Sequence, residues 1–324
     1  MKKSLDEIES TSHAALAAHG AADWQSREVA RAIRRAEETG NIICGLYYLE
    51  SYCQQLVSGR VSGTVEPEVS RSRSGVVEVD AGQGFAQPAF SKGMPIAVSA
   101  ARENGIALLK VSHAHTCTSL GYFTEQIAAN GLIGIGFTNA SAIVSGPGGK
   151  TPVLGTNPIA ITVPGDNAPL MHADFSTAAV ALGKITMAKA AGETIPLGWA
   201  VDEDGNPTTD PSAALGGSLV GAAGYKGWAL GLLVEFLAAG LGGTRLSLET
   251  KAIKLPEGPS HDLTQTYILI DPDTDQSGLQ NVSDRLAEAL ASDPEVRIPG
   301  ARRRTSQEPE INDALWEKVT ALAG

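Results

Sequence analysis

Apolar runs and helical spacing alternate most clearly between residues 105 and 164. Ile106 to Val111 and Leu132 to Phe137 are apolar at nearly every position, which is typical of strands buried on both faces. Between them, residues 119–130 have helical spacing and end at Gly131. A strand, a helix and a strand over about 30 residues predict a βαβ unit with a right-handed crossover.

The rest of the chain mixes helical and β patterns, so we expect an α/β fold. Helices are predicted over residues 4–18, 24–38, 45–57, 92–103, 178–191, 227–239, 282–291 and 312–322, and strands over 76–79, 159–163, 171–174 and 266–270. The 227–239 segment is apolar on most faces. We therefore expect it to be buried in a core or at a subunit interface.

Length and charge narrow the functional classes. A chain of 324 residues fits two domains or one large α/β unit. A net charge of -11 argues against nucleic acid or an anionic membrane as a partner. The N-terminus has no apolar signal region, and no apolar run is long enough to span a bilayer, so we expect a cytoplasmic protein. Three cysteines predict no disulfide framework.

Two short motifs near the predicted strands and helices carry candidate chemistry. Cys44 precedes the predicted third helix, where the helix dipole would favour a thiolate; an inert buried cysteine is the alternative. His113 and His115 lie two residues apart, but no third ligand has matching spacing, so no metal site is expected. His115 is either a pocket histidine or a partly exposed loop residue.

Glycine-rich loops follow the buried strands. Thr138-Asn139, residues 146–149 and residues 155–158 can present backbone N–H groups to a ligand. No GxGxxG follows the first strand, so the standard Rossmann fingerprint is absent. Asp174 ends an apolar strand, where it either caps a helix or holds a ribose hydroxyl. Lys226 opens an apolar helix, which favours an anionic partner.

Several longer segments resemble one enzyme family. GFTNA, GGKTPVLGTNPIAITVP, IPLGWAVDEDGNPTTDPSAAL and GYKGWALGLLVEFLAAGL together resemble the type-2 malate/L-lactate dehydrogenases. That family also includes sulfolactate and ureidoglycolate dehydrogenases and the piperideine/pyrroline-2-carboxylate reductases. The resemblance spans about residues 30–304, and VDAGQGFAQPA is similar to the cyclic-imine reductase branch in particular.

The resemblance implies an NAD(P)H-dependent oxidoreductase that forms a homodimer and acts on a small carboxylate substrate. It implies a non-Rossmann nicotinamide-binding domain with a mixed sheet, plus a helical domain formed by the N- and C-terminal parts. We accordingly expect residues 1–80 with 225–324 to form the helical, substrate-binding and dimerisation domain. Residues 81–224 are expected to form the cofactor-binding domain.

The resemblance also implies where the cofactor binds. The expected contacts are Thr116, Thr138, Asn139, Gly155, Thr156, Asn157, Asp174, Ser176, Thr177, Lys226, Gly227, Pro299 and Gly300. Arg302 to Arg304 are candidates for a 2′-phosphate contact only because they follow Pro299-Gly300. The choice between NADP and NAD is left open.

The expected catalytic residues depart from the family pattern. The family has Ser-His-Gly where this chain has Ile43-Cys44-Gly45, and Tyr47-Tyr48 stand where a substrate-binding arginine commonly follows. Many family members have a histidine in an NHFG-like motif after the first strand. In this chain the corresponding histidine, His115, is displaced by one position. The catalytic candidates are therefore Cys44, His115 and Tyr48.

Hydride transfer needs a proton donor. Cys44, with an unperturbed thiol pKa of roughly 8.5, could serve, or His115 if its side chain turns into the pocket. A cyclic imine can arrive already protonated, whereas a 2-oxo acid cannot. Two hypotheses follow: reduction of a small 2-oxo acid or cyclic 2-imino acid at C2, or a cofactor-binding protein that has lost redox catalysis.

Overall fold

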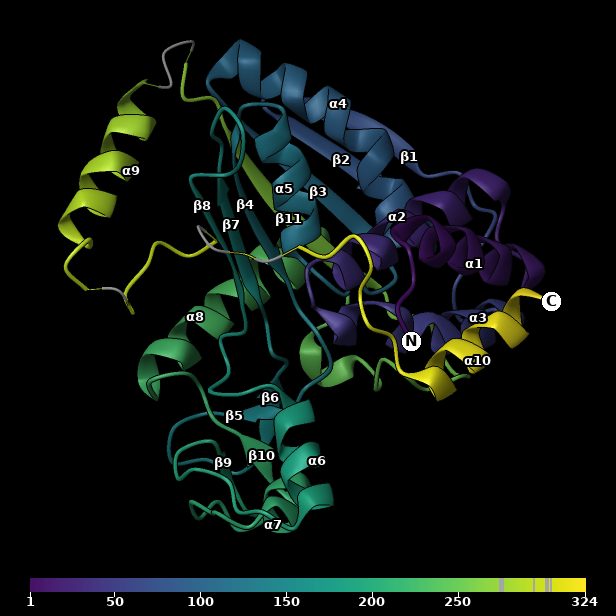
Figure 1. Cartoon of the computed structure of the whole chain (residues 1–324), viewed down its shortest axis with the longest axis vertical. Coiled ribbons are helices and arrows are strands. Elements are labelled where there is room, and N and C mark those ends of the chain that lie inside the picture. Colours follow the sequence, from purple (N-terminus) through teal and green to yellow (C-terminus); the bar gives the residue numbers. More distant parts are fainter. Residues whose placement is uncertain (274–276, 294, 301–302, 304) are drawn as a thin grey trace.

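A seven-stranded mixed sheet forms the frame of the molecule (Figure 1). The computed structural model describes residues 1–273, 277–293, 295–300, 303 and 305–324. In spatial order the strands are β1 (Glu68–Arg73), β2 (Val76–Asp80), β3 (Ile106–Ala114), β11 (Leu263–Ile270), β4 (Ile133–Thr138), β7 (Ile159–Val163) and β8 (Met171–Phe175). Only β2 and β3 pair in parallel among these neighbours. The expected α/β class with a mixed sheet is confirmed, and the non-Rossmann character stays a prediction.

The central strand comes from the last quarter of the chain. The predicted unit of β3, α5 (Gly121–Ala129) and β4 exists, but its strands are not neighbours, because β11 lies antiparallel between them. A local pattern identifies a strand and not its neighbours, which is why this insertion was missed. The sheet runs across the expected boundary between residues 81–224 and the remainder, and that domain division stays a prediction.

Two predicted boundaries were wrong for local reasons. Strand β1 lies before the predicted strand at residues 76–79, in a polar run (residues 70–74) where no strand was predicted; it is an edge strand paired only with β2, and most of its residues are exposed. Helix α4 spans Ala86–Asn104 and begins six residues earlier than predicted. Pro88 lies in its first turn, where a missing N–H costs nothing.

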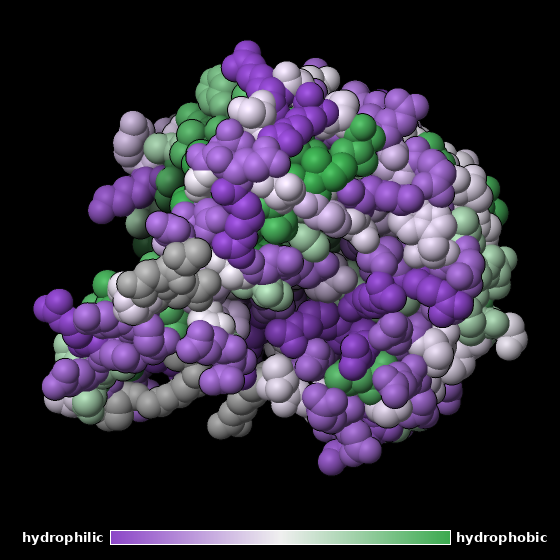
Figure 2. Space-filling model, turned by 90° about the horizontal axis from the view of Figure 1, so that it is seen from above, coloured by the Kyte–Doolittle hydropathy of each residue, from purple (hydrophilic) through white to green (hydrophobic). Residues whose placement is uncertain are grey.

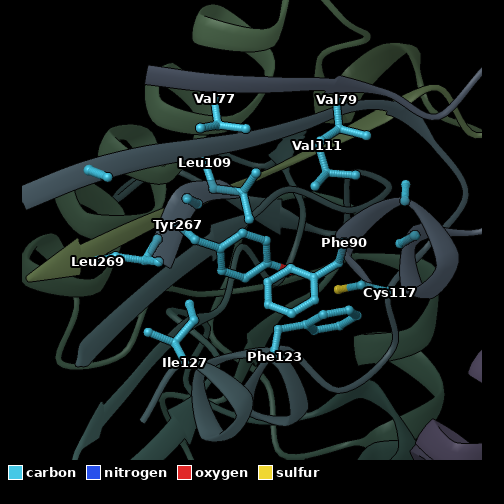
Figure 3. Close-up of a cluster of buried hydrophobic side chains, with 14 of the residues drawn as sticks. Val77, Val79, Phe90, Leu109, Val111, Cys117, Phe123, Ile127, Tyr267 and Leu269 are labelled. Atoms are coloured by element: carbon cyan, nitrogen blue, oxygen red, sulfur yellow. The ribbon is translucent and has the colours of Figure 1, made fainter. Parts of the chain in front are cut away.

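Helices α4 and α5 pack on the sheet around an aromatic cluster (Figure 3). The ring centroids of Phe90 and Phe123 are 4.9 Å apart, and those of Phe90 and Tyr267 are 5.0 Å apart. Gly136 faces the Tyr267 ring, which an added Cβ would approach to 3.1 Å. The apolar interior therefore ties β4 and β11 to both helices.

Both ends of the chain contribute to a helical cluster. It contains α1 (Leu5–Ala18), α2 (Asp23–Glu38), α3 (Leu49–Val57) and α10 (Asp313–Ala323), and α10 packs against α1 and α3. Figure 1 shows both termini on this side of the molecule. Trp316 and Val319 of α10 are buried in the same apolar cluster as Leu16 and Leu49. The predicted helices at both termini are confirmed.

A small second sheet has no counterpart among the predicted strands. Its order is β6 (Pro152–Leu154), β5 (Val144–Ser145), β10 (Ser218–Leu219) and β9 (Ala200–Val201), and α6 (Leu182–Ala191) and α7 (Pro211–Gly216) lie beside it (Figure 1). Strands of two or three residues are too short to show a period of two.

Two helices expose apolar side chains. Helix α8 (Tyr225–Glu235) continues into a π-helical turn, Phe236–Gly240; its buried side includes Gly231 and Val234. Leu233 and Phe236 are 46% and 71% exposed, so this helix is not buried in a core on all faces, and its expected burial at a subunit interface stays a prediction. Helix α9 (Ser277–Ala289) has no buried residue and stands away from the body (Figure 1).

Hydrophilic residues cover most of the face seen from above (Figure 2). Within the described residues, no helix has both the length and the apolarity needed to cross a bilayer.

Candidate functional site

The buried carboxylate of Glu235, at the end of α8, joins three segments. Its Oε1 accepts hydrogen bonds from the Ser247 N–H at 2.6 Å and from Asn139 Nδ2 at 3.3 Å. Its Oε2 accepts from Asn157 Nδ2 at 2.8 Å and from Ser247 Oγ at 2.6 Å. Ser247 begins the short helix η4 (Ser247–Glu249). The glycine-rich loops after β4 and before β7 are therefore fixed to one charged group.

The side chains of Asn139 and Asn157 are used within the protein. They are 1% and 0% exposed, and they also donate to the Arg245 and Gly231 carbonyls at 2.9 and 3.0 Å. Thr138 is buried as well, and its hydroxyl donates to the Thr264 carbonyl at 3.1 Å. These three side chains position the loops, and any cofactor contact there has to come from the backbone.

The loop at residues 155–158 is bound to the loop that follows β8. The Thr156 carbonyl accepts from the Thr177 N–H, from Thr177 Oγ1 and from Ser176 Oγ, all within 3.0 to 3.1 Å. Gly155 packs so closely that an added Cβ would collide with the Ala140 carbonyl oxygen. The sequence candidates Gly155, Thr156, Ser176 and Thr177 therefore lie together.

The N-terminus of α8 joins the same group. An added Cβ on Gly227 would collide with the Ala222 backbone and lie 2.5 Å from the Thr177 carbonyl oxygen. Lys226 is exposed beside this contact. A helix N-terminus and a lysine next to small hydroxyl side chains suit an anionic ligand such as a pyrophosphate. The residues present therefore fit the phosphate part of a dinucleotide.

Asp174 caps a helix, although not the one that follows it. Its Oδ2 accepts from the N–H of Gly121, the first residue of α5, at 2.8 Å and from Ser119 Oγ at 3.4 Å. Loss of hydration raises the pKa of the Asp174 carboxyl, even though the residue as a whole stays exposed. The cap and a contact to a ribose hydroxyl both remain compatible with this position, since a carboxylate has further acceptor capacity.

The C-terminal turn at Pro299-Gly300 lies against β8. The His172 N–H donates to the Pro299 carbonyl at 2.9 Å, and Gly300 has a φ of +85° that favours glycine. Arg303 forms an ion pair with Glu125, which also pairs with Arg35 at 2.9 Å. Arg302 and Arg304, the other 2′-phosphate candidates, lie outside the described residues.

The segment that carries Cys44 and Tyr48 forms two short 3₁₀ turns, η1 (Ile42–Cys44) and η2 (Leu46–Tyr48). The buried carboxylate of Glu37 accepts from the Leu46 N–H at 2.8 Å, and any Cβ on Gly45 would collide with it. Asn41 Nδ2 donates to Ser119 Oγ at 3.4 Å, and Ser119 in turn contacts Asp174. This segment is therefore linked to the end of β8.

Of the two alternatives for Cys44, the structure favours a buried, protonated thiol over a thiolate at a helix N-terminus. Helix α3 begins only at Leu49, so Cys44 does not lie at its N-terminus. Burial, with the Asp174 carboxylate nearby, raises the pKa of the Cys44 thiol to about 12. Burial likewise raises the pKa of the Tyr48 phenol to about 12. Both groups are protonated at neutral pH.

His115 lies in the interior and does not turn into an open pocket. It is 1% exposed, its Nε2 donates to Gln55 Oε1 at 2.7 Å, and its ring stacks on His261 with centroids 4.0 Å apart. Burial lowers its pKa well below the usual value, so the imidazole is neutral. The Thr116 N–H donates to His261 Nδ1 at 3.2 Å, so Thr116 belongs to this buried cluster.

His113 is separate from His115, and its Nδ1 lies 2.8 Å from Asp262 Oδ1. Within the described ranges, no three His, Cys, Asp or Glu side chains are grouped to hold a metal ion. A hollow of about 300 Å³ between α2 and α5 is lined by Arg31, Arg34, Arg35, Glu38, Tyr122, Glu125, Gln126 and Ala129, and it does not include Cys44 or Lys226.

Comparison with known proteins identifies the family. A sequence model described as malate/L-lactate dehydrogenase matches residues 4–319. The chain belongs to the malate/L-lactate dehydrogenase family. The expectation of an NAD(P)-dependent oxidoreductase is thereby confirmed.

Relatives and solved structures match the chain over nearly its whole length. A (2R)-3-sulfolactate dehydrogenase (NADP(+)) of Chromohalobacter salexigens is 36% identical over 99% of this chain and 97% of the relative. A Delta(1)-pyrroline-2-carboxylate reductase of Ancylobacter novellus is 37% identical over 99% and 97%. The delta1-piperideine-2-carboxylate reductase structure from Pseudomonas syringae superposes with a TM-score of 0.91 at 32% identity, covering 99% of both chains.

Sequence reasoning missed the residues that hold this family member's loops. Glu37, Gln55 and Arg60 gave no signal, because single polar residues in amphipathic helices, as Glu37 and Gln55 are, or in the loop after a helix, as Arg60 is, are usually solvated. Glu235 did give one, as the only charge within residues 227–241. A lone acid in an apolar helix predicts buried hydrogen-bond donors around it.

Glu235→Gln should weaken nucleotide binding. The Glu235 carboxylate accepts four hydrogen bonds through two oxygens, whereas an amide has only one acceptor oxygen. The two glycine-rich loops would therefore lose hydrogen bonds that fix their position. We expect the Kd for the reduced nucleotide to rise about tenfold or more. Titration of nucleotide fluorescence measures this. Leu16→Ala, in the separate helical core, is the control: it should lower stability without changing that Kd, and equal effects would contradict the assignment.

Stability should fall as the pH drops below about 6.5. The pKa values of His115 and His261 are lowered, to about 3 for His261, whereas the unfolded chain takes up protons near 6.5. Below that pH the unfolded state binds more protons than the folded state. The free energy of unfolding therefore falls by up to about 1.4 kcal/mol per pH unit for each histidine. Urea unfolding at pH 7.5 and 5.5 checks this. In His115→Gln the free energy of unfolding should change less between the two pH values. An unchanged difference would contradict the role of His115 in this pH dependence.

Proposed function

We propose that the chain reduces the C=N bond of a cyclic 2-imino acid of the pyrroline- or piperideine-2-carboxylate type. The observation that carries the proposal is the chemistry at position 44. A thiol with a pKa of about 12 is a poor proton donor, and the buried neutral His115 is not available as a substitute. A cyclic imine that binds in its protonated form needs only a hydride.

The chain's own residues bind and orient the reactants. The bound reduced nicotinamide supplies the hydride, which is added to substrate C2. Lys226 and the first turn of α8, with Ser176 and Thr177, would hold the phosphates. The Glu235 hydrogen bonds fix the neighbouring loops. The linked segments at Cys44 and Asp174 would face the substrate, with the Tyr48 phenol as a neutral hydrogen-bond donor.

The relatives support this choice. Reductases of Delta(1)-pyrroline-2-carboxylate from Ancylobacter novellus and of both ring sizes from Pseudomonas putida are 37% and 35% identical to the chain. The Pseudomonas syringae structure named for piperideine-2-carboxylate has the same fold at 32% identity. The sulfolactate relative is named for NADP(+), which favours NADPH as the cofactor here.

A 2-oxo acid such as sulfopyruvate is the second candidate. It is favoured by the 36% identity to a sulfolactate dehydrogenase. This reaction requires a proton for the new hydroxyl group. Asp174, with a raised pKa and a position beside Cys44, is the group that would have to supply it.

A substrate panel tests the proposal. Loss of NADPH absorbance should be fast with piperideine-2-carboxylate or pyrroline-2-carboxylate and slow with pyruvate, oxaloacetate and sulfopyruvate. Cys44→His should raise turnover of the 2-oxo acids by about a hundredfold or more, because an imidazole can act as general acid. Cys44→Ser is the matched control and should bring no such gain.

Other outcomes have clear meanings. Faster turnover of sulfopyruvate by the native protein would select the second candidate. Nucleotide binding without turnover of any substrate in the panel would favour a family member that has lost redox catalysis.

We also propose that the functional unit is a homodimer in which a second copy covers α8. Leu230, Leu233 and Phe236 expose an apolar stripe on α8 and the π-helical turn. Helix α9, with exposed Val282 and Leu286, has no buried residue in a single chain. A 13-residue helix is marginal in water without a packed face, so it needs a partner.

Phe236→Asp should break the dimer. Burying an unpaired carboxylate in an apolar contact is costly. Light scattering coupled to size exclusion should give the mass of two chains for the native protein and of one for the variant. Val57→Asp, on another exposed apolar residue at the end of α3, should leave the mass unchanged. A native monomer, or a dimeric Phe236→Asp, would refute this arrangement.

A further inference from the structure

We propose that Lys254 binds the carboxylate of the substrate. This inference rests on the proposed function, which requires an anionic substrate beside Cys44. From Cys44 to Tyr52 the chain contains no lysine or arginine, and the charged groups there, Glu50 and the nearby Asp174, are acidic. A cation must therefore come from another part of the chain if a carboxylate is to bind there.

Lys254 lies beside Tyr47 and Tyr48, although about two hundred residues separate it from them in the sequence. Its Nζ lies 3.1 Å from the centroid of the Tyr47 ring and 5.1 Å from that of Tyr48. The two rings meet edge to face at 5.6 Å, and the Tyr48 phenol lies close to Cys44. The ammonium group is therefore held over an aromatic pair at the edge of the candidate site.

Gln55 fixes the backbone on both sides of Lys254. Its Nε2 donates to the Ile253 carbonyl at 2.6 Å and to the Leu255 carbonyl at 2.8 Å. Gln55 is 0% exposed, and its Oε1 accepts from the buried His115. A lysine whose two neighbours are held by a buried amide is placed by the fold, unlike a lysine on a free loop.

Arg60 also fixes this segment, residues 252–259, through hydrogen bonds to its backbone carbonyls. Only 2% of this arginine is exposed, and it donates to the Ala252 carbonyl at 3.1 Å, to the Pro259 carbonyl at 3.0 Å and to the Leu255 carbonyl. Ser58 Oγ adds a hydrogen bond to the Pro256 carbonyl at 2.7 Å. A guanidinium buried among carbonyls is costly unless it is well satisfied, so the 252–259 segment has a fixed position.

The ammonium group of Lys254 is free to bind an anion. In the part of the chain that the structure describes, no carboxylate lies within ion-pair distance of Lys254. Its present partners are ring faces, which attract a cation weakly at exposed sites and satisfy none of its three N–H donors fully. A substrate carboxylate would form a charge-assisted hydrogen bond there, with the neutral Tyr48 hydroxyl as a second donor.

Lys254→Met tests the assignment, and Lys251→Met is the matched control, because Lys251 is an exposed lysine on the same stretch. For piperideine-2-carboxylate, Lys254→Met should raise KM about tenfold to a hundredfold, the loss of one charged hydrogen bond, with little change in kcat. Lys254→Arg should restore most of the affinity, since it keeps the charge. The Kd for NADPH and the thermal midpoint should be unchanged in all three variants.

A binding measurement separates this inference from the proposed reaction. Calorimetry with picolinate, an unreactive ring carboxylate, in the presence of NADP⁺ should show weaker binding to Lys254→Met than to Lys251→Met. The uncharged picolinamide should not distinguish them. If picolinate discriminates but no imine is reduced, the proposed reaction fails while Lys254 stands. If neither picolinate nor the imine distinguishes the two variants, the assignment of Lys254 is wrong.

Discussion

The loops that form the proposed cofactor site depend on one buried negative charge. Glu235 receives four hydrogen bonds from Asn139, Asn157 and Ser247, which belong to three separate segments. A carboxylate in an apolar helix is costly to bury, and only this full set of donors makes the position tolerable. The helix that carries it also packs its first turn against Thr177, so one rigid element sets both ends of the site.

The opposite side of the site is built by a second set of buried polar groups. Glu37 holds the turn that carries Cys44, while Gln55 and Arg60 hold the 252–259 segment. His115 donates a hydrogen bond to Gln55 and so fixes the orientation of its amide. In both halves, buried polar side chains bind backbone groups of the loops.

The sequence was most informative where the pattern was local. The buried strands β3 and β4, the helices at both termini and the small-residue loops at 155–158 could all be predicted, because period and composition act over a few residues. The insertion of β11 between β3 and β4 could not, since it depends on contacts more than a hundred residues apart. The same holds for Lys254, whose neighbours Tyr47 and Tyr48 are distant in sequence.

The candidate site residues also differ in how well the sequence predicted them. Thr156, Ser176, Thr177, Lys226 and Gly227 were grouped by resemblance and lie together in the structure. Cys44 and His115 were catalytic candidates because they stand at or beside the positions of family motifs. Burial, which sequence patterns describe poorly for single polar residues, determines that one keeps its proton and that the other supports the interior.

The position of β11 also bears on how the protein is made. Strands β3 and β4 leave the ribosome long before residues 263–270, so each carries an unpaired edge for roughly ten seconds at ordinary rates of synthesis. Unpaired apolar edges are the part of a sheet most prone to join another chain. The sheet can close only after residues 263–270 are made, so a chain that ended before residue 263 would leave the facing edges of β3 and β4 without their partner.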